Sequence, residues 1–100
     1  MTKVRLFTNG FSVKGHCSAD VNDENGRLVC AAVSSAVYMT VNTITDVVGD
    51  KADIIERDGE MTVKVANISP ASKTVLKGFE IHILQLSAQY KDCIKVYSEV

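Results

Sequence analysis

Two residues of this 100-residue chain have the chemistry for acyl transfer, a histidine at position 16 and a cysteine at position 30. A thiolate is a strong nucleophile, and a neighbouring histidine can accept the thiol proton before the attack. His16 lies near the end of a predicted strand, and Cys30 lies at the beginning of a predicted helix. We therefore predict that His16 and Cys30 are the base and the nucleophile of a cysteine peptidase.

Both residues also have simpler interpretations, which the sequence leaves open. Period-two alternation places His16 on the polar face of its strand, where an exposed histidine is common. Cys30 can equally be a small buried hydrophobe that packs with its valine neighbours. A cysteine in the first turn of a helix lies near unpaired N–H groups that lower its pKa, and Arg27 lies one turn earlier. Ser34 shares a helix face with Cys30 because it is four residues on.

The segment between the two residues, Cys17 to Arg27, is polar and rich in turn formers. It predicts a surface loop, which is either a lid over a substrate or a plain solvated connection. Gly15, Asp20, Arg27 and Ser34 are the candidate substrate-binding or lid residues. Gly15, directly before His16, allows the close approach of another backbone or marks a bulge.

The other ionisable and thiol side chains give weaker signals. The three cysteines are an odd number, and Met1–Leu6 shows no apolar signal-peptide core, so we expect no secretion signal and free thiols rather than a disulfide framework. Their spacing matches no common zinc pattern, and we expect neither a metal nor a cofactor. His82 and Cys93 are interpreted as structural. A redox sensor that uses Cys17 and Cys30 remains a further alternative.

Hydrophobic periodicity and turn signals predict an α+β fold. It is a two-layer fold with a mostly antiparallel sheet of about five strands, in the order ββαββαβ, and two long helices packed on one face. The predicted elements are strands at 4–6 and about 11–17 around an Asn9-Gly10 turn, a helix from about Leu28 to Val47 that Gly49 caps, strands at 54–57 and 61–65 around Asp58-Gly59, a helix opened by Ser69 and Pro70, and a strand at 93–97.

Composition sets outer limits on the class of protein. With 46% hydrophobic and 23% charged residues, the chain can form one domain over residues 1–100. A net charge of -1 argues against direct nucleic-acid contact, although a local basic patch would not appear in that sum. No run approaching a membrane span is expected, and a cytoplasmic location follows. The sheet face without helices needs a partner or a polar coat, and spare apolar surface would favour a homodimer.

Taken together, Gly15-His16, a variable loop, Val29-Cys30-Ala31-Ala32-Val33-Ser34 and Asn42 resemble the ribosomal-processing cysteine protease family of Firmicutes and related bacteria. The resemblance is specific in the segment from His16 to Cys30 and only a matter of pattern in the C-terminal half. It implies that His16 is the general base, that Cys30 is the nucleophile and that the protein is a homodimer. The implied substrate is the N-terminal extension of large-subunit ribosomal protein number twenty-seven, cut after a phenylalanine in a short apolar, aromatic motif.

Two departures from the family pattern matter. Many members carry an aspartate three residues before the cysteine, where this chain has Arg27. Orientation of the histidine would then depend on Asp20, Asp23 or Glu24. Where the family usually has an alanine after Gly-His, this chain has Cys17. We interpret this cysteine as a silent replacement. A function of another class also fits the sequence: a non-catalytic, ribosome-associated binding module in which Cys30 is a core residue.

Overall fold

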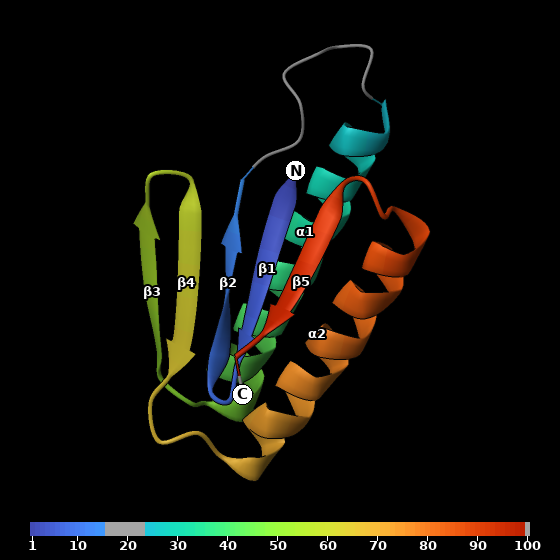
Figure 1. The fold of residues 1–100 in the computed structure, drawn as a ribbon. Coiled ribbons are helices and arrows are strands. Elements are labelled where there is room, and N and C mark those ends of the chain that lie inside the picture. The colour runs from blue at the N-terminus through green and yellow to red at the C-terminus, as the bar shows by residue number, and fades with distance from the viewer. Residues whose placement is uncertain (16–23, 100) are drawn as a thin grey trace.

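A computed structural model describes residues 1–15 and 24–99 of the chain. One five-stranded sheet is covered on one face by two helices, which confirms the predicted α+β fold class (Figure 1). In chain order the elements are β1 (Thr2–Phe7), β2 (Gly10–Lys14), α1 (Glu24–Asn42), the π-helical turn η1 (Thr43–Val48), β3 (Ala52–Arg57), β4 (Glu60–Val65), α2 (Pro70–Gln89) and β5 (Ile94–Ser98).

The strands lie in the order β3-β4-β2-β1-β5. All pairs are antiparallel except β1 with β5, which is parallel. The pairing of β2 with β4 joins the two hairpins and places Lys14 opposite Glu60. As a result, the turn between β3 and β4 lies beside the end of β2, where the chain runs towards His16.

One of the two predicted hairpin turns is confirmed, and the other is shifted by one residue. Asp58 and Gly59 both have positive φ, at 50° and 74°, as a tight hairpin turn requires. In the first hairpin, Phe7 pairs with Gly10, so Thr8 and Asn9 form the turn. Gly10 is the first residue of β2. A side chain is not tolerated there, because its Cβ would collide with the backbone carbonyl of Val63 on β4. This glycine therefore permits close strand packing, and the predicted Asn9-Gly10 turn was wrong.

The core lies between the helices and one face of the sheet. The rings of Phe11 on β2 and Phe79 on α2 stack with centroids 4.2 Å apart, and they join the two layers. Helical spacing of apolar residues predicts a core-facing stripe of Val33, Val37, Val41, Ile44 and Val48 on the first helix. Val33, Val37 and Ile44 are buried, and Val41 and Val48 are partly buried. The other fully or nearly fully buried apolar side chains include Val4, Val29, Val63, Val65, Ile83 and Ile94.

The first helix begins at Glu24, four residues before its predicted start. The predicted polar loop from Cys17 to Arg27 is therefore wrong over its last four residues, and its other residues lie outside the described part of the chain. Asn25-Gly26 looks like a turn in the sequence, but Gly26 is buried within α1, so packing overrides local propensity. The second strand is also shorter than predicted, since β2 ends at Lys14.

The helix formed by α1 and η1, Glu24–Val48, is long and apolar enough to cross a membrane by length and composition alone. The expectation that no segment approaches such a span was therefore wrong. Valines and alanines raise the hydropathy of this segment, yet its buried face packs on the sheet through Val29, Val33 and Val37. The core helix of a soluble protein meets the same criterion.

The second helix begins as predicted, with Ser69 as its N-cap and Pro70 in the first turn. The Ser69 hydroxyl accepts a bond from the Ser72 N–H, and it donates to Asp50, which follows η1. Asp50 thus ties the end of the first helical segment to the start of α2.

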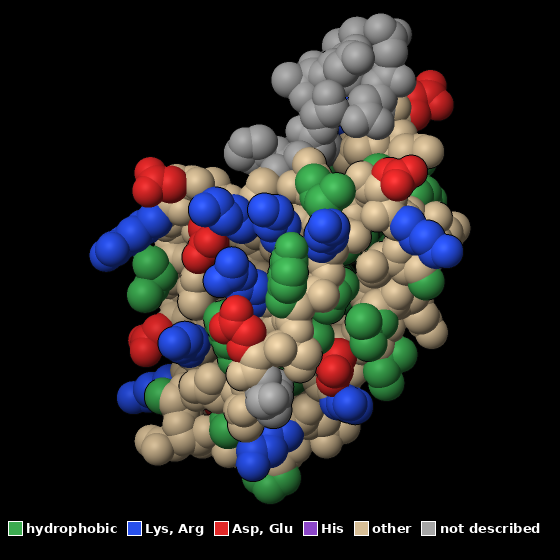
Figure 2. Space-filling model, viewed as in Figure 1, with side chains coloured by type: hydrophobic (Ala, Val, Ile, Leu, Met, Phe, Trp, Pro, Cys, Tyr) green, Lys and Arg blue, Asp and Glu red, His purple; other side chains and the backbone are tan. Residues whose placement is uncertain are grey.

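The sheet face opposite the helices has a polar coat. The exposed side chains of Lys3, Arg5, Lys14, Lys64 and Lys95 project from it, and Figure 2 shows basic side chains gathered over the strands. Most of the exposed large apolar side chains lie on the helices, among them Tyr38 and Met39 on α1 and Ile81 and Leu84 on α2, whereas Ile55 and Tyr97 are exposed on the open sheet face. Spare apolar surface is therefore mostly on the helical side of the molecule.

Candidate active site

Cys30 is the seventh residue of α1 and is partly buried. The predicted position in the first helical turn was wrong, because α1 begins at Glu24. Only the first four N–H groups of an α-helix lack partners within it, and the effect of the helix dipole falls off after the first turn. The N–H groups of the first turn are therefore not the donors that act on the thiol or on an oxyanion beside it.

Gly15 fixes the direction in which the chain enters the next residue, His16. Its φ of +94° lies in a region that side-chain-bearing residues rarely adopt, and a Cβ would collide with the backbone carbonyl of Met1. The Gly15 N–H donates to the Gly59 carbonyl oxygen at 3.3 Å, which attaches the end of β2 to the β3–β4 turn. The predicted close backbone approach at Gly15 is confirmed.

Three residues of the predicted site region, His16, Cys17 and Asp20, lie outside the described part of the chain. The pairing of His16 with Cys30 therefore stays a prediction. Gly15 and Ser34 are brought together, because both line one groove. Arg27 is exposed on α1, one helical turn before Cys30.

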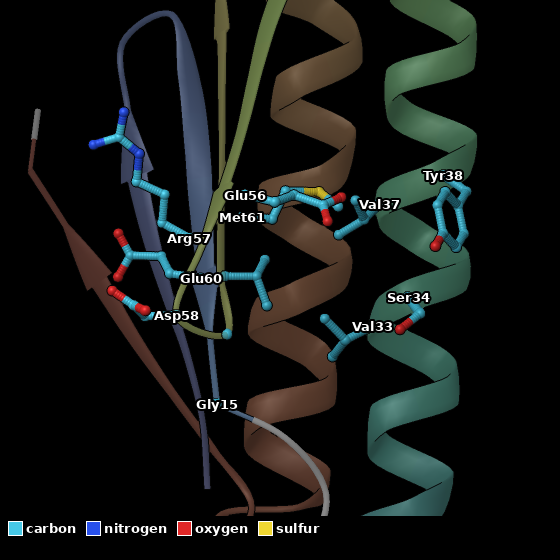
Figure 3. Close-up of a pocket in the computed structure, with 12 residues that line it drawn as sticks. Gly15, Val33, Ser34, Val37, Tyr38, Glu56, Arg57, Asp58, Glu60 and Met61 are labelled. Carbon is cyan, nitrogen blue, oxygen red and sulfur yellow. The ribbon is translucent and has the colours of Figure 1, made fainter.

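The groove lies between α1 and the β3–β4 hairpin and has a volume of about 440 Å³ (Figure 3). Cys30 does not line the groove; Val33 and Ser34, one helical turn beyond it, are the first residues of α1 that do, and the groove extends along the helix from there. Its lining comprises Val13 and Gly15 from the β2 end, Val33, Ser34, Val37 and Tyr38 from α1, and Glu56, Arg57, Asp58, Gly59, Glu60 and Met61 from the hairpin.

The floor of the groove is apolar. Val33 is 3% exposed and Val37 is 5% exposed, and Val13 and Met61 pack against the same core. The hairpin contributes most of the charge, and in Figure 3 Arg57, Asp58 and Glu60 project away from α1. An extended peptide with apolar side chains fits such a floor, because backbone groups remain free to contact the polar rim.

The hairpin residues of this groove were missed in the sequence. The Asp58-Gly59 turn was recognised, but nothing local showed that β4 pairs with β2 and brings that turn beside Gly15. Within residues 1–15 and 24–99, no group of three or more His, Cys, Asp or Glu side chains could hold a metal ion.

The other two signals from the sequence lie away from this groove. Cys93, just before β5, is partly buried and packs against the core. His82 is exposed on α2 and lines a different groove, between α1 and α2.

Comparison with known proteins identifies the family. A model of the cysteine protease Prp family matches residues 1–95. The chain belongs to the cysteine protease Prp family. This finding confirms the resemblance noted in the sequence, and it makes the chain a member of a family of cysteine proteases.

Solved Prp structures share the fold. The ribosomal processing protease Prp of Staphylococcus aureus, with a covalently linked product peptide, has a TM-score of 0.86 and 17% identity over 99% of this chain and 100% of that chain. The same protease with a substrate peptide has a TM-score of 0.86 and 18% identity over 99% of this chain and 100% of that chain. A Streptococcus mutans protein has a TM-score of 0.81 and 17% identity over 98% of this chain and 93% of that chain. No curated protein matches the chain.

Proposed function

We propose that this Prp family member is an endopeptidase in which Cys30 is the nucleophile and His16 the general base. One observation carries the proposal: Gly15, the residue directly before His16, lines the groove whose helical wall begins one turn beyond Cys30. Because Gly15 lies on the strand side of this groove, we expect His16 to approach the thiol from the side opposite α1. The proposal thus requires the two groups needed for thiol activation at the same end of one groove.

The proposed reaction has two steps. The Cys30 Sγ attacks the scissile carbonyl carbon while His16 holds the thiol proton, and the carbon–nitrogen bond breaks as that proton passes to the leaving amine. Water that is deprotonated by His16 then attacks the thioester. The acid product leaves and the thiol is restored.

The proposed substrate is the N-terminal extension of large-subunit ribosomal protein number twenty-seven, cut after a phenylalanine. Two findings support it: the S. aureus relative is a ribosomal processing protease with structures that hold product and substrate peptides, and the sequence resembles that family in its Gly15–Ser34 segment. The apolar floor formed by Val33, Val37 and Met61 suits an apolar, aromatic motif.

The catalytic assignment is tested by removing each group. Cys30→Ala and His16→Ala should each reduce cleavage of an extension peptide to background, because the nucleophile or its base is lost. Cys17→Ala is the matched control, since it removes a thiol beside His16 and should keep cleavage. Peptide mass analysis gives the rate, and circular dichroism checks the fold. Full activity in either catalytic variant would refute the assignment.

The non-catalytic binding module is separated from the peptidase by thiol reactivity. Cys30 and Cys93 are both partly buried, so Cys93 serves as an internal reference. A catalytic Cys30 should react with iodoacetamide about tenfold faster or more at neutral pH, since the thiolate is the reactive form. Equal, slow labelling of both would favour the binding module.

The assembly and location are also proposals. We propose a homodimer that forms through the helical side, where α1 and α2 border an apolar groove of about 670 Å³. Met39 and Thr43 lie on one side of this groove and Gly78 and Leu86 on the other. A cytoplasmic location, without direct contact to nucleic acid or membrane, stays a prediction.

A further inference from the structure

Glu56 places a carboxylate over the otherwise apolar floor of the groove beside Cys30. On β3 it pairs with Met61 of β4, and it shares the helix-facing side of its strand with Ile54. Figure 3 shows its side chain extending across Met61 towards Val37. The three other charged residues that line the groove, Arg57, Asp58 and Glu60, project away from α1, so Glu56 is the charge on the floor of the groove.

Within residues 1–15 and 24–99, the carboxylate of Glu56 makes no ion pair. Among the described residues, the ion pairs are Arg5 with Glu99 and Lys77 with Glu80, and neither involves Glu56. A carboxylate next to apolar surface is less screened than one in bulk water, so a cation from a ligand gains more by approaching it. The helix-facing side of the groove thereby combines apolar contacts with a carboxylate that makes no ion pair with a described residue.

A different role for Glu56 must be distinguished. Because β3 is an edge strand, an inward-facing charge on it can protect the sheet against pairing with another chain. That role concerns aggregation and predicts no effect on which peptide the groove accepts.

The rise of α1 gives the distance along the helix axis from Cys30 to this charge. Val37, which Glu56 faces, is seven residues beyond Cys30, or about 10 Å along the axis at 1.5 Å per residue. An extended peptide covers about 3.3 Å per residue, so this distance corresponds to roughly three substrate residues. We infer that Glu56 selects substrates with a lysine or arginine about three residues from the scissile bond. The position of that residue rests on the proposed function, because it counts from Cys30 as nucleophile.

Peptide series test the inference. One apolar, aromatic parent peptide carries Lys, Gln or Glu at each position from two to five residues on either side of the cut. The variants are Glu56→Gln and Glu56→Lys, with Asp53→Asn as the control, since Asp53 is exposed on the same strand but on the opposite face. The readout is kcat/KM for each peptide.

The wild-type protein should prefer Lys over Glu about three- to tenfold at one position near the third residue, the scale of a partly exposed charge pair. Glu56→Gln should reduce this preference to about twofold or less, and Glu56→Lys should reverse it. Asp53→Asn should keep it. Raising the salt concentration should weaken the preference in the wild type, because screening acts on the charge pair.

Failure of the inference and failure of the proposed function give different results. If the wild type cleaves the peptides but Glu56→Gln discriminates charge as Asp53→Asn does, Glu56 does not select the substrate and the peptidase stands. Binding of the same peptides to Cys30→Ala, with and without Glu56→Gln, is measured by calorimetry. Charge-dependent binding that needs Glu56, without any cleavage by the wild type, overturns the peptidase and keeps the selection. Binding that ignores charge overturns the selection.

Discussion

At the scale of single residues, Gly15 is the described residue with the most demanding backbone. Gly15 has a positive φ, and the carbonyl group of Met1 lies where a Cβ of residue 15 would be. It immediately precedes His16 in the sequence. Gly49 has nearly the same φ, +90°, but nothing lies within 4 Å of its would-be Cβ. The two glycines therefore separate the cost of a left-handed backbone from the cost of a steric collision.

Gly15→Ala should destabilise the protein more than Gly49→Ala. The left-handed conformation alone costs about 1–2 kcal/mol in each variant, and the collision with Met1 adds to it at Gly15 only. Urea unfolding measures both free energies, and peptide cleavage shows whether the shifted strand end also displaces His16. Equal losses of stability would mean that the N-terminal strand moves aside without cost.

Cys30 shows what one residue's context can and cannot predict. Its place on a helix, with Ser34 on the same face, was correctly predicted from the spacing of apolar residues. Its place within the helix was not, since Asn25-Gly26 is locally a turn signal and only packing makes it helical. The helix-start explanation for a reactive thiol fails with that correction, so the expectation of a reactive Cys30 now depends on the proposed pairing with His16.

At the scale of elements, Asp50 connects the end of η1 to the start of α2. Its Oδ2 accepts bonds from the Ser69 N–H at 3.0 Å and the Ser69 hydroxyl at 2.7 Å. The nearby Ser72 hydroxyl and these two Ser69 donors hold the pKa of Asp50 below its usual value of 3.8. The Ser69 bonds are the well-formed ones, because the buried Ser72 hydroxyl has no partner of ordinary hydrogen-bond geometry within the described residues.

The lowered pKa gives a pH dependence with a definite sign. Because the folded pKa of Asp50 is below the unfolded one, its stabilising effect is complete above the unfolded value and is lost as pH falls through the folded value. Asp50→Asn should therefore destabilise the protein most near neutral pH and progressively less in acid. Thermal unfolding between pH 2 and 7 measures this, with Asp53→Asn as an exposed control. A constant difference across this range would contradict the prediction.

The elements themselves were largely predictable because their signals are local. Asp58-Gly59 and Gly49 each mark a boundary through a positive φ that few residues adopt. Ser69-Pro70 marks the start of α2 through a capping hydroxyl and a residue without an N–H. The turn predicted at Asn9-Gly10 was wrong, because Gly10 is needed for close contact with Val63 of a distant strand rather than for a turn. Such contacts depend on which strands pair, and the local sequence does not indicate that pairing.

At the scale of the whole molecule, the groove between α1 and the β3–β4 hairpin exists because two distant segments meet. Val33 and Val37 were predicted to face the core, but Glu56 and Met61 join them only through the β2–β4 pairing. The floor of the groove was thus partly predictable from helical periodicity. The charged wall of the groove was not predictable. The placement of most exposed apolar side chains on the helices, and of basic residues on the open sheet face, was not predictable either.

The exposed apolar side of the helices predicts where two copies meet. The groove between α1 and α2 has open space above Gly78, because no atom lies within 4 Å of the position that a Cβ would take there. Met39, at the border of the groove, is 68% exposed. Such a concave apolar surface with a projecting apolar side chain can bury itself against its own copy, as a two-fold interface requires.

Met39→Glu should therefore shift the protein from dimer to monomer, because the contact would leave a charge unpaired in an apolar groove. Val47→Glu is the matched control: Val47 is 79% exposed on η1 and does not line the groove, so this variant should remain a dimer. Sedimentation over a range of concentrations gives the mass, and circular dichroism checks that both variants fold. A wild type that stays monomeric, or a dimer unaffected by Met39→Glu, would contradict an interface on the helical side. A dimer lost only with Val47→Glu would place it at the end of the first helix instead.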